Sequence, residues 1–370
     1  MYEYQGLSDA LFMALYGAVA MMALLGGLNL MFARGNVVAE KVAPPKSLRH
    51  WAVAFLAVVV ASHVWWFVLG TVWLSADRVV RDTVCIALDL STLVPLMMAV
   101  LLRLLQDRRR LLWPWFAAQL PVVAMAVWGI AKGDMSYATG GNGRPGWMVI
   151  YQMAIILLFL SSYVHALRQY GRWLRDNYAD LEHKEVWQSL VVILVIVAVY
   201  CLYTTNGGSL FREYLSQFNS MLIIAFVVWR VEALSSLTPE SLATDSLPNG
   251  EGSAPSSTDA MIDGVLKKRC EETGLYLQPD LTLTELARGV GTNRTYLGAY
   301  FAGRGTTYYG YINRLRIDHF CQLYCEALAE GRTVVAKQLA AECGYSSYRT
   351  FANAFRTQTG QSPTEWIRSQ

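Results

Sequence analysis

The sequence lacks the motifs that mark several common classes of membrane enzyme. No HExxH occurs, which argues against a zincin-type intramembrane protease. No glycine-rich loop ends in Gly-Lys-Ser or Gly-Lys-Thr, so nothing indicates nucleotide-driven work. Lysine is absent from residues 186–203 and 214–231, the last two long apolar runs, which argues against a retinal Schiff base at its usual position. We therefore expect no enzymatic activity and no cofactor.

Cysteine is scarce, and the few cysteines show no paired spacing. The six include no CxxC pair, which favours reduced thiols over a disulfide framework. Two lie in apolar runs and four lie in the C-terminal region: Cys85, Cys201, Cys270, Cys321, Cys325 and Cys343. Cys321 and Cys325 lie one helical turn apart near His319, which leaves a metal site open as an alternative. Small buried side chains on a core helix explain the spacing better, and we expect no metal.

Net charge is also small, so bulk charge identifies no partner. The chain carries 31 basic and 28 acidic residues, a formal net charge of +3. Residues 259–370 carry 13 basic and 11 acidic residues, and this bias of +2 is weaker than many nucleic-acid-binding domains show. Binding to nucleic acid must therefore be argued from sequence pattern.

Long apolar runs, in contrast, fill the first 234 residues. Hydrophobic residues make up 54% of the chain. Seven runs are each long enough to cross a hydrocarbon core of ~30 Å. We place them at Ser8–Phe32, Trp51–Leu74, Val84–Leu105, Leu111–Ile130, Trp147–Leu167, Val186–Tyr203 and Tyr214–Val231. The first has no basic start and no small-residue cleavage site, so we interpret it as a retained span and not as a signal peptide.

The basic residues between the runs predict an orientation. Twelve lie in the first, third and fifth loops: Arg34, Lys41, Lys46, Arg49, Arg103, Arg108, Arg109, Arg110, Arg168, Arg172, Arg175 and Lys184. Five lie in the second, fourth and sixth loops: Arg78, Arg81, Lys132, Arg144 and Arg212. Because basic loops stay in the cytoplasm, the sequence predicts a multi-pass protein of the inner membrane with its N-terminus outside and its C-terminus in the cytoplasm.

Asp89 and His63 are the candidate sensor residues within the spans. Ionisable side chains are costly inside a bilayer and usually serve a function. Asp89 lies in the third run, beside Ser91 and Thr92, and His63 lies in the second. Both are about 10–17 Å from the outer end of their runs, a comparable depth at which they could pair. The alternative is that each bonds a neighbouring backbone group or faces a wet crevice.

A polar stretch, residues 235–258, follows the last apolar run. It is rich in Ser, Thr, Pro, Gly and acidic residues, cannot bury apolar area and is predicted to be disordered. A flexible coil of this length has an r.m.s. span of roughly 25–29 Å and reaches about 80 Å when extended. We therefore interpret it as a tether that confines the C-terminal region near the bilayer and transmits no rigid rotation. The signalling hypothesis is that association of the spans changes how two tethered C-terminal domains share one site.

A helix-turn-helix pattern occupies Leu281–Phe301. Its first helix would bury one apolar face, formed by Leu283, Leu286, Ala287 and Val290. Gly291 permits a tight turn, and Asn293 is a good N-cap for a second helix. We expect that second helix to bury Tyr296, Leu297 and Phe301. This order of small residue, turn glycine and capped helix is what a helix-turn-helix needs.

A second copy occupies Val335–Phe355. Its small residue is Ala340, its turn glycine is Gly344, its cap is Ser346 or Ser347, and Phe351 and Phe355 would pack inward. Between the copies, Tyr308–Leu328 has apolar residues at helical spacing, and such a helix is about 32 Å long. That length is close to one turn of duplex, ~34 Å, so the pattern would place two recognition helices in successive major grooves.

Residues from about 261 to 368 resemble the AraC-type DNA-binding domain. The resemblance is carried by the paired motifs, by the connecting helix at Tyr311–Ile317, and by the ending Phe355–Arg368. The stretch Asn293–Leu297 is similar to forms common in Bacteroidota, where such domains are also found fused to membrane spans.

The resemblance implies which residues face DNA. In the second recognition helix they would be Tyr348, Arg349, Ala352 and Asn353, with Arg349 pairing with guanine and Asn353 with adenine. In the first they would be Thr295, Gly298 and Ala299, with Arg294 beside a phosphate. Gly298 and Ala299 have no side-chain hydrogen-bonding group, which departs from family members with polar residues there. The alternative for Arg349 is a solvated surface charge.

These observations predict an all-α chain in three parts. Residues 1–234 would form a seven-helix transmembrane bundle, residues 235–258 a flexible linker, and residues 259–370 a soluble double helix-turn-helix domain.

The function expected of this organisation is that of a membrane-anchored, one-component transcription regulator. Its partners would be double-stranded promoter DNA, the lipid bilayer, a small-molecule or membrane signal, a second copy in a homodimer, and RNA polymerase if the protein activates. One alternative is a seven-span transporter or membrane enzyme with a regulatory C-terminal domain. Another is a membrane scaffold whose motifs bind protein.

Overall fold

The computed structural model of the chain divides into two compact units. The N-terminal unit comprises residues 1–168 and 186–237, and the C-terminal unit comprises residues 169–185 and 238–370. The residues that the structure describes are 7–32, 44–70, 78–133, 140–141, 144–179, 181, 184–205, 210–237, 255–332 and 335–370.

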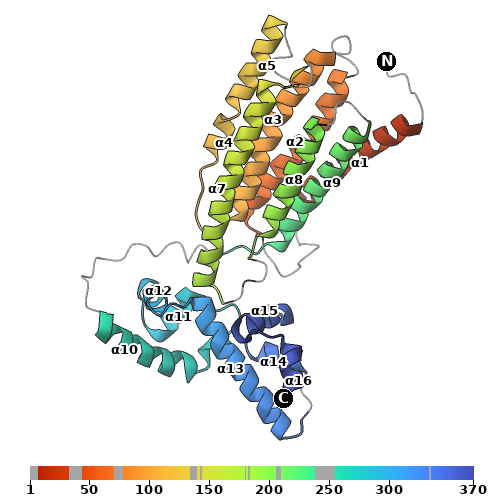
Figure 1. Cartoon of the computed structure of the whole chain (residues 1–370). Helices are drawn as coiled ribbons and strands as arrows, with labels where there is room; N and C mark the ends of the chain where they lie inside the picture. Colours follow the sequence, from red (N-terminus) through yellow and green to blue (C-terminus); the bar gives the residue numbers. More distant parts are fainter. Residues whose placement is uncertain are drawn as a thin grey trace. The chain divides into compact units, whose positions relative to one another are not determined.

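The described part of the N-terminal unit is built from helices (Figure 1). It also contains one very short hairpin. Its helices are α1 (Leu7–Phe32), α2 (Lys46–Val68), α3 (Arg78–Leu104), α4 (Trp113–Ala117), α5 (Leu120–Lys132), α7 (Trp147–Asn177), α8 (Gln188–Thr205) and α9 (Leu210–Ala233). Strands β1 (Gly140–Gly141) and β2 (Arg144–Pro145) pair antiparallel. The expectation of an all-α fold is confirmed apart from this hairpin.

Six helical segments among the described residues are long and apolar enough to cross a membrane. They correspond to six of the seven predicted runs. The remaining run corresponds to α8, whose described apolar part, Gln188–Val199, is shorter. Large apolar side chains are exposed along these helices, including Leu25 at 58%, Leu120 at 69% and Leu158 at 58%. Such faces are unfavourable in water and suit a lipid surround.

The predicted fourth span is broken into α4 and α5. The break at Ala118 and Gln119 precedes Pro121, which lies in the first turn of α5. A proline ring clashes with the carbonyl four residues earlier and lacks a backbone N–H, so the helix ends there and restarts.

Within the N-terminal unit, α1 packs against α2 and α9, α2 against α3, α3 against α5, and α8 against α9. The end of α9 is fastened by side-chain amides. Asn29 donates to Glu232 at 2.8 Å. Gln106 donates to the carbonyl of Ser235 and accepts from the amide of Leu237, each at 2.9 Å.

Both ends of the expected linker, residues 235–258, are therefore structured. Its first three residues are held by Gln106, and its last four lie in helix α10, which begins at Pro255. Residues 238–254, which carry the rest of that prediction, lie outside the described residues.

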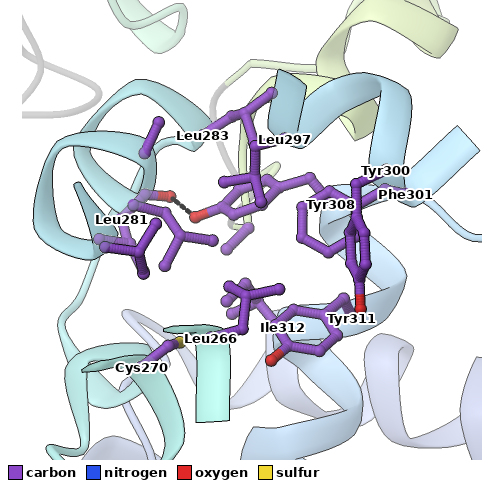
Figure 2. Close-up of a cluster of buried hydrophobic side chains, with 14 of the residues drawn as sticks. Leu266, Cys270, Leu281, Leu283, Leu297, Tyr300, Phe301, Tyr308, Tyr311 and Ile312 are labelled. Carbon is purple, nitrogen blue, oxygen red and sulfur yellow. Dashed lines mark hydrogen bonds between the residues drawn. The ribbon is translucent and has the colours of Figure 1, made fainter. Parts of the chain in front are cut away.

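The C-terminal unit contains two helix-turn-helix motifs joined by one long helix. Its elements are α10 (Pro255–Leu266), a π-helical turn η3 (Lys267–Glu271), a 3-10 turn η4 (Leu275–Leu277), α11 (Leu283–Val290), α12 (Arg294–Gly303), α13 (Tyr308–Ala329), α14 (Ala336–Glu342), α15 (Tyr348–Thr359) and α16 (Pro363–Ser369). Each motif has its own apolar core, and α13 contributes residues to both. Figure 2 shows the first core, where the Tyr308 hydroxyl donates to the carbonyl of Leu281 at 2.8 Å.

Side-chain caps define where the motif helices begin. Thr282 and Glu285 form a reciprocal capping box at α11. Asn293 caps α12 as predicted, accepting from the amide of Tyr296 at 2.8 Å. At α15 the cap is Ser347 and not Ser346, because the Ser347 hydroxyl accepts from the amide of Thr350 at 3.2 Å.

One expected core residue, Tyr296, is exposed instead. Leu297, Tyr300 and Phe301 form the buried side of α12, while Tyr296 is 52% exposed. At 100° per residue, Tyr296 lies roughly 90° from the middle of that buried side. Tyr300 occupies the place that the sequence pattern assigned to Tyr296.

The turn glycines adopt the left-handed backbone conformation that their motifs require. Gly291 has φ 80° and Gly344 has φ 85°. Gly344 is additionally crowded, because a Cβ placed there would lie 2.4 Å from the backbone oxygen of Leu277. The second motif's turn therefore rests directly on η4.

We expect Gly344→Ala to destabilise the C-terminal unit by about 3 kcal/mol or more, from the left-handed backbone and the steric clash together. Gly360→Ala is the matched control, because Gly360 also has a positive φ but open space around it, and should cost about 1–2 kcal/mol. Hydrogen exchange of the α14 and α15 amides in the full chain measures both. Equal costs for the two variants would contradict the close contact with η4.

Candidate nucleic-acid interface

Helix α15 presents a polar face opposite its buried face. Thr350, Phe351, Ala354 and Phe355 are buried, whereas Arg349 and Asn353 are exposed. At 100° per residue, these two exposed residues lie roughly opposite Phe351 on the helix. The face therefore offers a guanidinium and an amide, the two groups best suited to pair with guanine and adenine.

The other two predicted positions on α15 flank this face. Tyr348 and Ala352 are both half-buried, and the Tyr348 ring lies 5.6 Å from the Phe351 ring. Arg356 was missed in the sequence, although it follows Arg349 by seven residues and therefore shares its face. Arg356 is exposed, so the face carries two guanidinium groups and one amide.

Helix α12 presents a less polar face. Thr295 and Ala299 are exposed, while Gly298 is half-buried, with Leu283 3.9 Å from where its Cβ would be. Exposed Tyr296 adds a phenol hydroxyl that sequence reasoning had placed in the core. The lack of hydrogen-bonding side chains at Gly298 and Ala299 is thus partly offset by Thr295 and Tyr296.

Arg294, the predicted phosphate contact, is half-buried in an intramolecular contact. Its Nε donates to the Oδ1 atom of Asn177 at 3.0 Å. Asn177 is the last residue of α7 and belongs to the C-terminal unit.

Arg316 fixes the two motifs relative to each other from inside the C-terminal unit. Its side chain is fully buried on α13. Its guanidinium donates to the carbonyls of Tyr276 and Gln278, at 2.8 and 2.7 Å, and lies over the Tyr345 ring at 5.4 Å. Because Tyr345 precedes α15, this arginine links η4, α13 and the second motif. Helix α13, with 22 residues, is about 33 Å long, close to one turn of duplex.

The cysteines of α13 do not form the core of a metal site within the described residues, where no group of three or more His, Cys, Asp or Glu residues is placed to hold an ion. Cys321 is half-buried and Cys325 is exposed. Burial, with the neighbouring charge of Asp318, raises the pKa of the Cys321 thiol to about 11. That thiol is therefore protonated near neutral pH.

A second candidate site is a polar cluster among the apolar helices. The Asp89 carboxylate on α3 accepts from the Ser62 hydroxyl at 2.6 Å and from the Trp66 indole at 2.8 Å, both on α2. Among the described residues, these hydrogen bonds to Asp89 come from α2, and its pairing with His63 stays a prediction. The aspartate is held by neutral donors.

His63, also on α2, joins the same cluster. One of its ring nitrogens lies 2.8 Å from the carbonyl of Val59, and the other lies 3.3 Å from the amide oxygen of Gln217 on α9. The Tyr16 hydroxyl of α1 donates to the His63 carbonyl at 2.7 Å. Four helices, α1, α2, α3 and α9, thus meet around Asp89 and His63.

Comparison with known proteins identifies the domain that carries the polar α15 face. Residues 286–369 match the family of helix-turn-helix domains, and the resemblance to the AraC type is confirmed for this C-terminal domain. The chain is 28% identical over 174 residues to an uncharacterized HTH-type transcriptional regulator of Staphylococcus aureus (strain MRSA252), and 27% identical over 174 residues to another from strain COL. Each match covers 45% of this chain and 23% of the relative, so the chain spans about a quarter of the length of these curated relatives. No solved structure matches the chain.

Proposed function

We propose that the protein is a membrane-anchored transcription regulator that binds promoter DNA through α12 and α15. The observation that carries this proposal is the outward face of α15, where Arg349, Asn353 and Arg356 are exposed together. A purely structural helix surface needs no such combination of groups. The match to helix-turn-helix domains supports the same conclusion.

In this proposal the two motifs contribute unequally. Arg349 and Asn353 would read bases, Tyr348 and Ala352 would pack along the groove wall, and Arg356 would contact phosphate. The first motif would contribute mainly through Thr295 and Tyr296, with Arg294 contacting phosphate. The buried Arg316 would keep the two helices at the spacing of successive major grooves.

The proposed orientation places the C-terminal unit in the cytoplasm. The twelve-to-five distribution of basic loop residues supports it, and so does the need of a DNA-binding domain to reach the chromosome. RNA polymerase, if the protein activates, and a second copy of the chain would be further partners at the promoter.

The sensing site proposed for the spans is the cluster around Asp89 and His63. A carboxylate in a bilayer needs partners, and Asp89 depends on two donors from a single neighbouring helix. A ligand that takes one of these donors, or a proton on the carboxylate, would change the packing of α2 against α3. Since α1 and α9 also contact His63, such a change would reach four helices.

We expect Arg349→Ala and Asn353→Ala each to cost about 1–3 kcal/mol of binding free energy at one base position of the preferred site. Arg356→Ala should instead weaken binding to all sequences and reduce its salt dependence. The measurement uses full-length protein in nanodiscs and duplexes selected from a random library. Arg332→Ala, an exposed arginine beyond the end of α13, is the charge-matched control. Unchanged sequence preference in Arg349→Ala would show that α15 is not the base-reading helix.

The orientation predicts opposite results for two reporter fusions. A reporter joined after Arg110 should register the cytoplasm, and one joined after Gly143 should register the exterior, because basic loops are retained inside. The reverse pattern would place the C-terminal unit outside the cell and refute the DNA-binding proposal with it.

We expect Asp89→Asn to shift the basal output of a regulated reporter gene by about fivefold or more, since a change of ~1 kcal/mol between two signalling states suffices. The substitution keeps the side chain's size and removes its charge. Asp82→Asn is the matched control on the same helix, where Asp82 pairs with Arg81 instead of joining the cluster. If the basal reporter output of Asp89→Asn equals that of the wild-type protein and of the control variant, Asp89 has no sensory role.

A further inference from the structure

The connection between α7 and α8 packs as part of the C-terminal unit. Residues 169–185 belong to that unit, although the chain on both sides of them belongs to the N-terminal unit. From its basic residues we expected this stretch to be a cytoplasmic loop between two spans. Its contacts with the helix-turn-helix domain suggest a different role.

Ala179 is built into the first apolar core of the C-terminal unit. Its exposed fraction is 0%, and it packs with the cluster that contains Leu281 and Tyr308. Its amide donates to the carbonyl of Leu281 at 3.4 Å, and Tyr178 forms an antiparallel bridge with Thr282 beside it. The segment thus makes one isolated antiparallel bridge with the start of the first motif.

A buried amide on α13 provides a second attachment. Asn313 is fully buried, and its Nδ2 donates to the carbonyl of Ala179 at 3.1 Å as well as to that of Tyr309. A buried side-chain amide is costly unless it is hydrogen-bonded. Asn313 therefore makes the position of Ala179 specific.

The segment is also braced at its far end. Lys184 pairs with Asp280 at 3.3 Å and lies over the Tyr178 ring at 5.4 Å. The Tyr170 hydroxyl donates to the Lys184 carbonyl at 2.9 Å. These contacts hold Tyr178 and Lys184 beside Asp280, which precedes α11.

The same segment engages the arginine at the start of the first recognition helix. Asn177 accepts from Arg294, the first residue of α12. At the other end of the segment, partial burial raises the pKa of the Glu185 carboxyl, and the charges of Arg175 and Arg349 oppose that shift. Residues 176–185 include four acidic residues and one lysine, so the segment resembles DNA in the sign of its charge.

We propose that the segment held by Asn177, Tyr178, Ala179 and Lys184 inhibits the helix-turn-helix domain to which it binds, and competes with DNA for Arg294. This inference rests on the DNA-binding function proposed above. The segment follows α7 and precedes α8, so a change in the packing of the spans is transmitted to it through both ends. Release of the segment, and not movement of the tether, is then the step that permits DNA binding.

The expected size of the effect follows from the population of the docked form. If the domain is free of the segment in about 0.1–10% of molecules, the apparent DNA affinity is lowered by the same fraction, and complete release raises it about 10- to 1000-fold.

A reversible disulfide tests the docked state in the full-length protein. Paired residues of an antiparallel bridge have Cα atoms about 4.5–5.5 Å apart, within the range a disulfide can span. Oxidised Tyr178→Cys/Thr282→Cys protein in nanodiscs should bind a 40-base-pair duplex of random sequence at least about tenfold more weakly than the same protein after reduction. Each single cysteine variant, oxidised and reduced in parallel, controls for the loss of the Thr282 cap and for the native thiols.

A complementary variant weakens the docking of the segment and leaves the apolar core around Ala179 unchanged. Asn177→Ala/Glu185→Gln removes the Asn177 acceptor of Arg294 and one negative charge of the segment, and should bind the same duplex at least about tenfold more tightly than wild type. Arg172→Gln, an exposed change on the same stretch of α7, should leave binding unchanged. If the locked, wild-type and released proteins all bind duplex equally, the segment does not inhibit and DNA binding stands. If even the released protein binds no duplex, both proposals fall.

Discussion

Two buried polar side chains on α13, one helical turn apart, organise the C-terminal unit. Arg316 donates to the backbone carbonyls of Tyr276 and Gln278, just before the first motif, and packs on Tyr345, which couples this turn to the second motif. Asn313 satisfies the carbonyl of Ala179, which couples the same helix to the segment between α7 and α8. Buried polar groups are costly when left unpaired, so each of them specifies one arrangement of its neighbours. The spacing of the recognition helices and the docking of the segment thus depend on one helix.

Much of the C-terminal fold was predictable because its signals are local. Asn293 caps a helix, Gly344 adopts a positive φ, and Phe351 and Phe355 repeat at helical spacing; each needs only its sequence neighbours to be interpreted. Tyr296 was misplaced because it and Tyr300 both lie within reach of the same apolar stripe, and tertiary packing chose between them. Arg356 could have been found from the sequence, because it follows Arg349 by seven residues and so lies on the same helix face.

The long-range contacts could not be predicted in this way. Nothing near Ala179 in the sequence marks it as a core residue of a domain whose first motif begins about one hundred positions later. The pairing of Asn313 with it joins residues 134 positions apart. In the spans, the position of Asp89 in its apolar run indicated its depth but not its partners. Which side chains of α2 reach Asp89 depends on how α2 is rotated against α3, and this rotation brings Ser62 and Trp66 to it. The interruption between α4 and α5, in contrast, was marked in the sequence by Pro121.

The position of Ala179 in the chain has a consequence for biosynthesis. Ala179 leaves the ribosome before Leu281, and at about 5–20 residues per second a separation of about 100 residues corresponds to ~5–20 s. The first core of the helix-turn-helix domain therefore completes itself around a residue that was made earlier. A newly synthesised domain meets its own docking segment, tethered in the same molecule, before it can meet a promoter elsewhere in the cell. The default state at the end of translation would then be the silent one, and each new copy would require a signal before it could act.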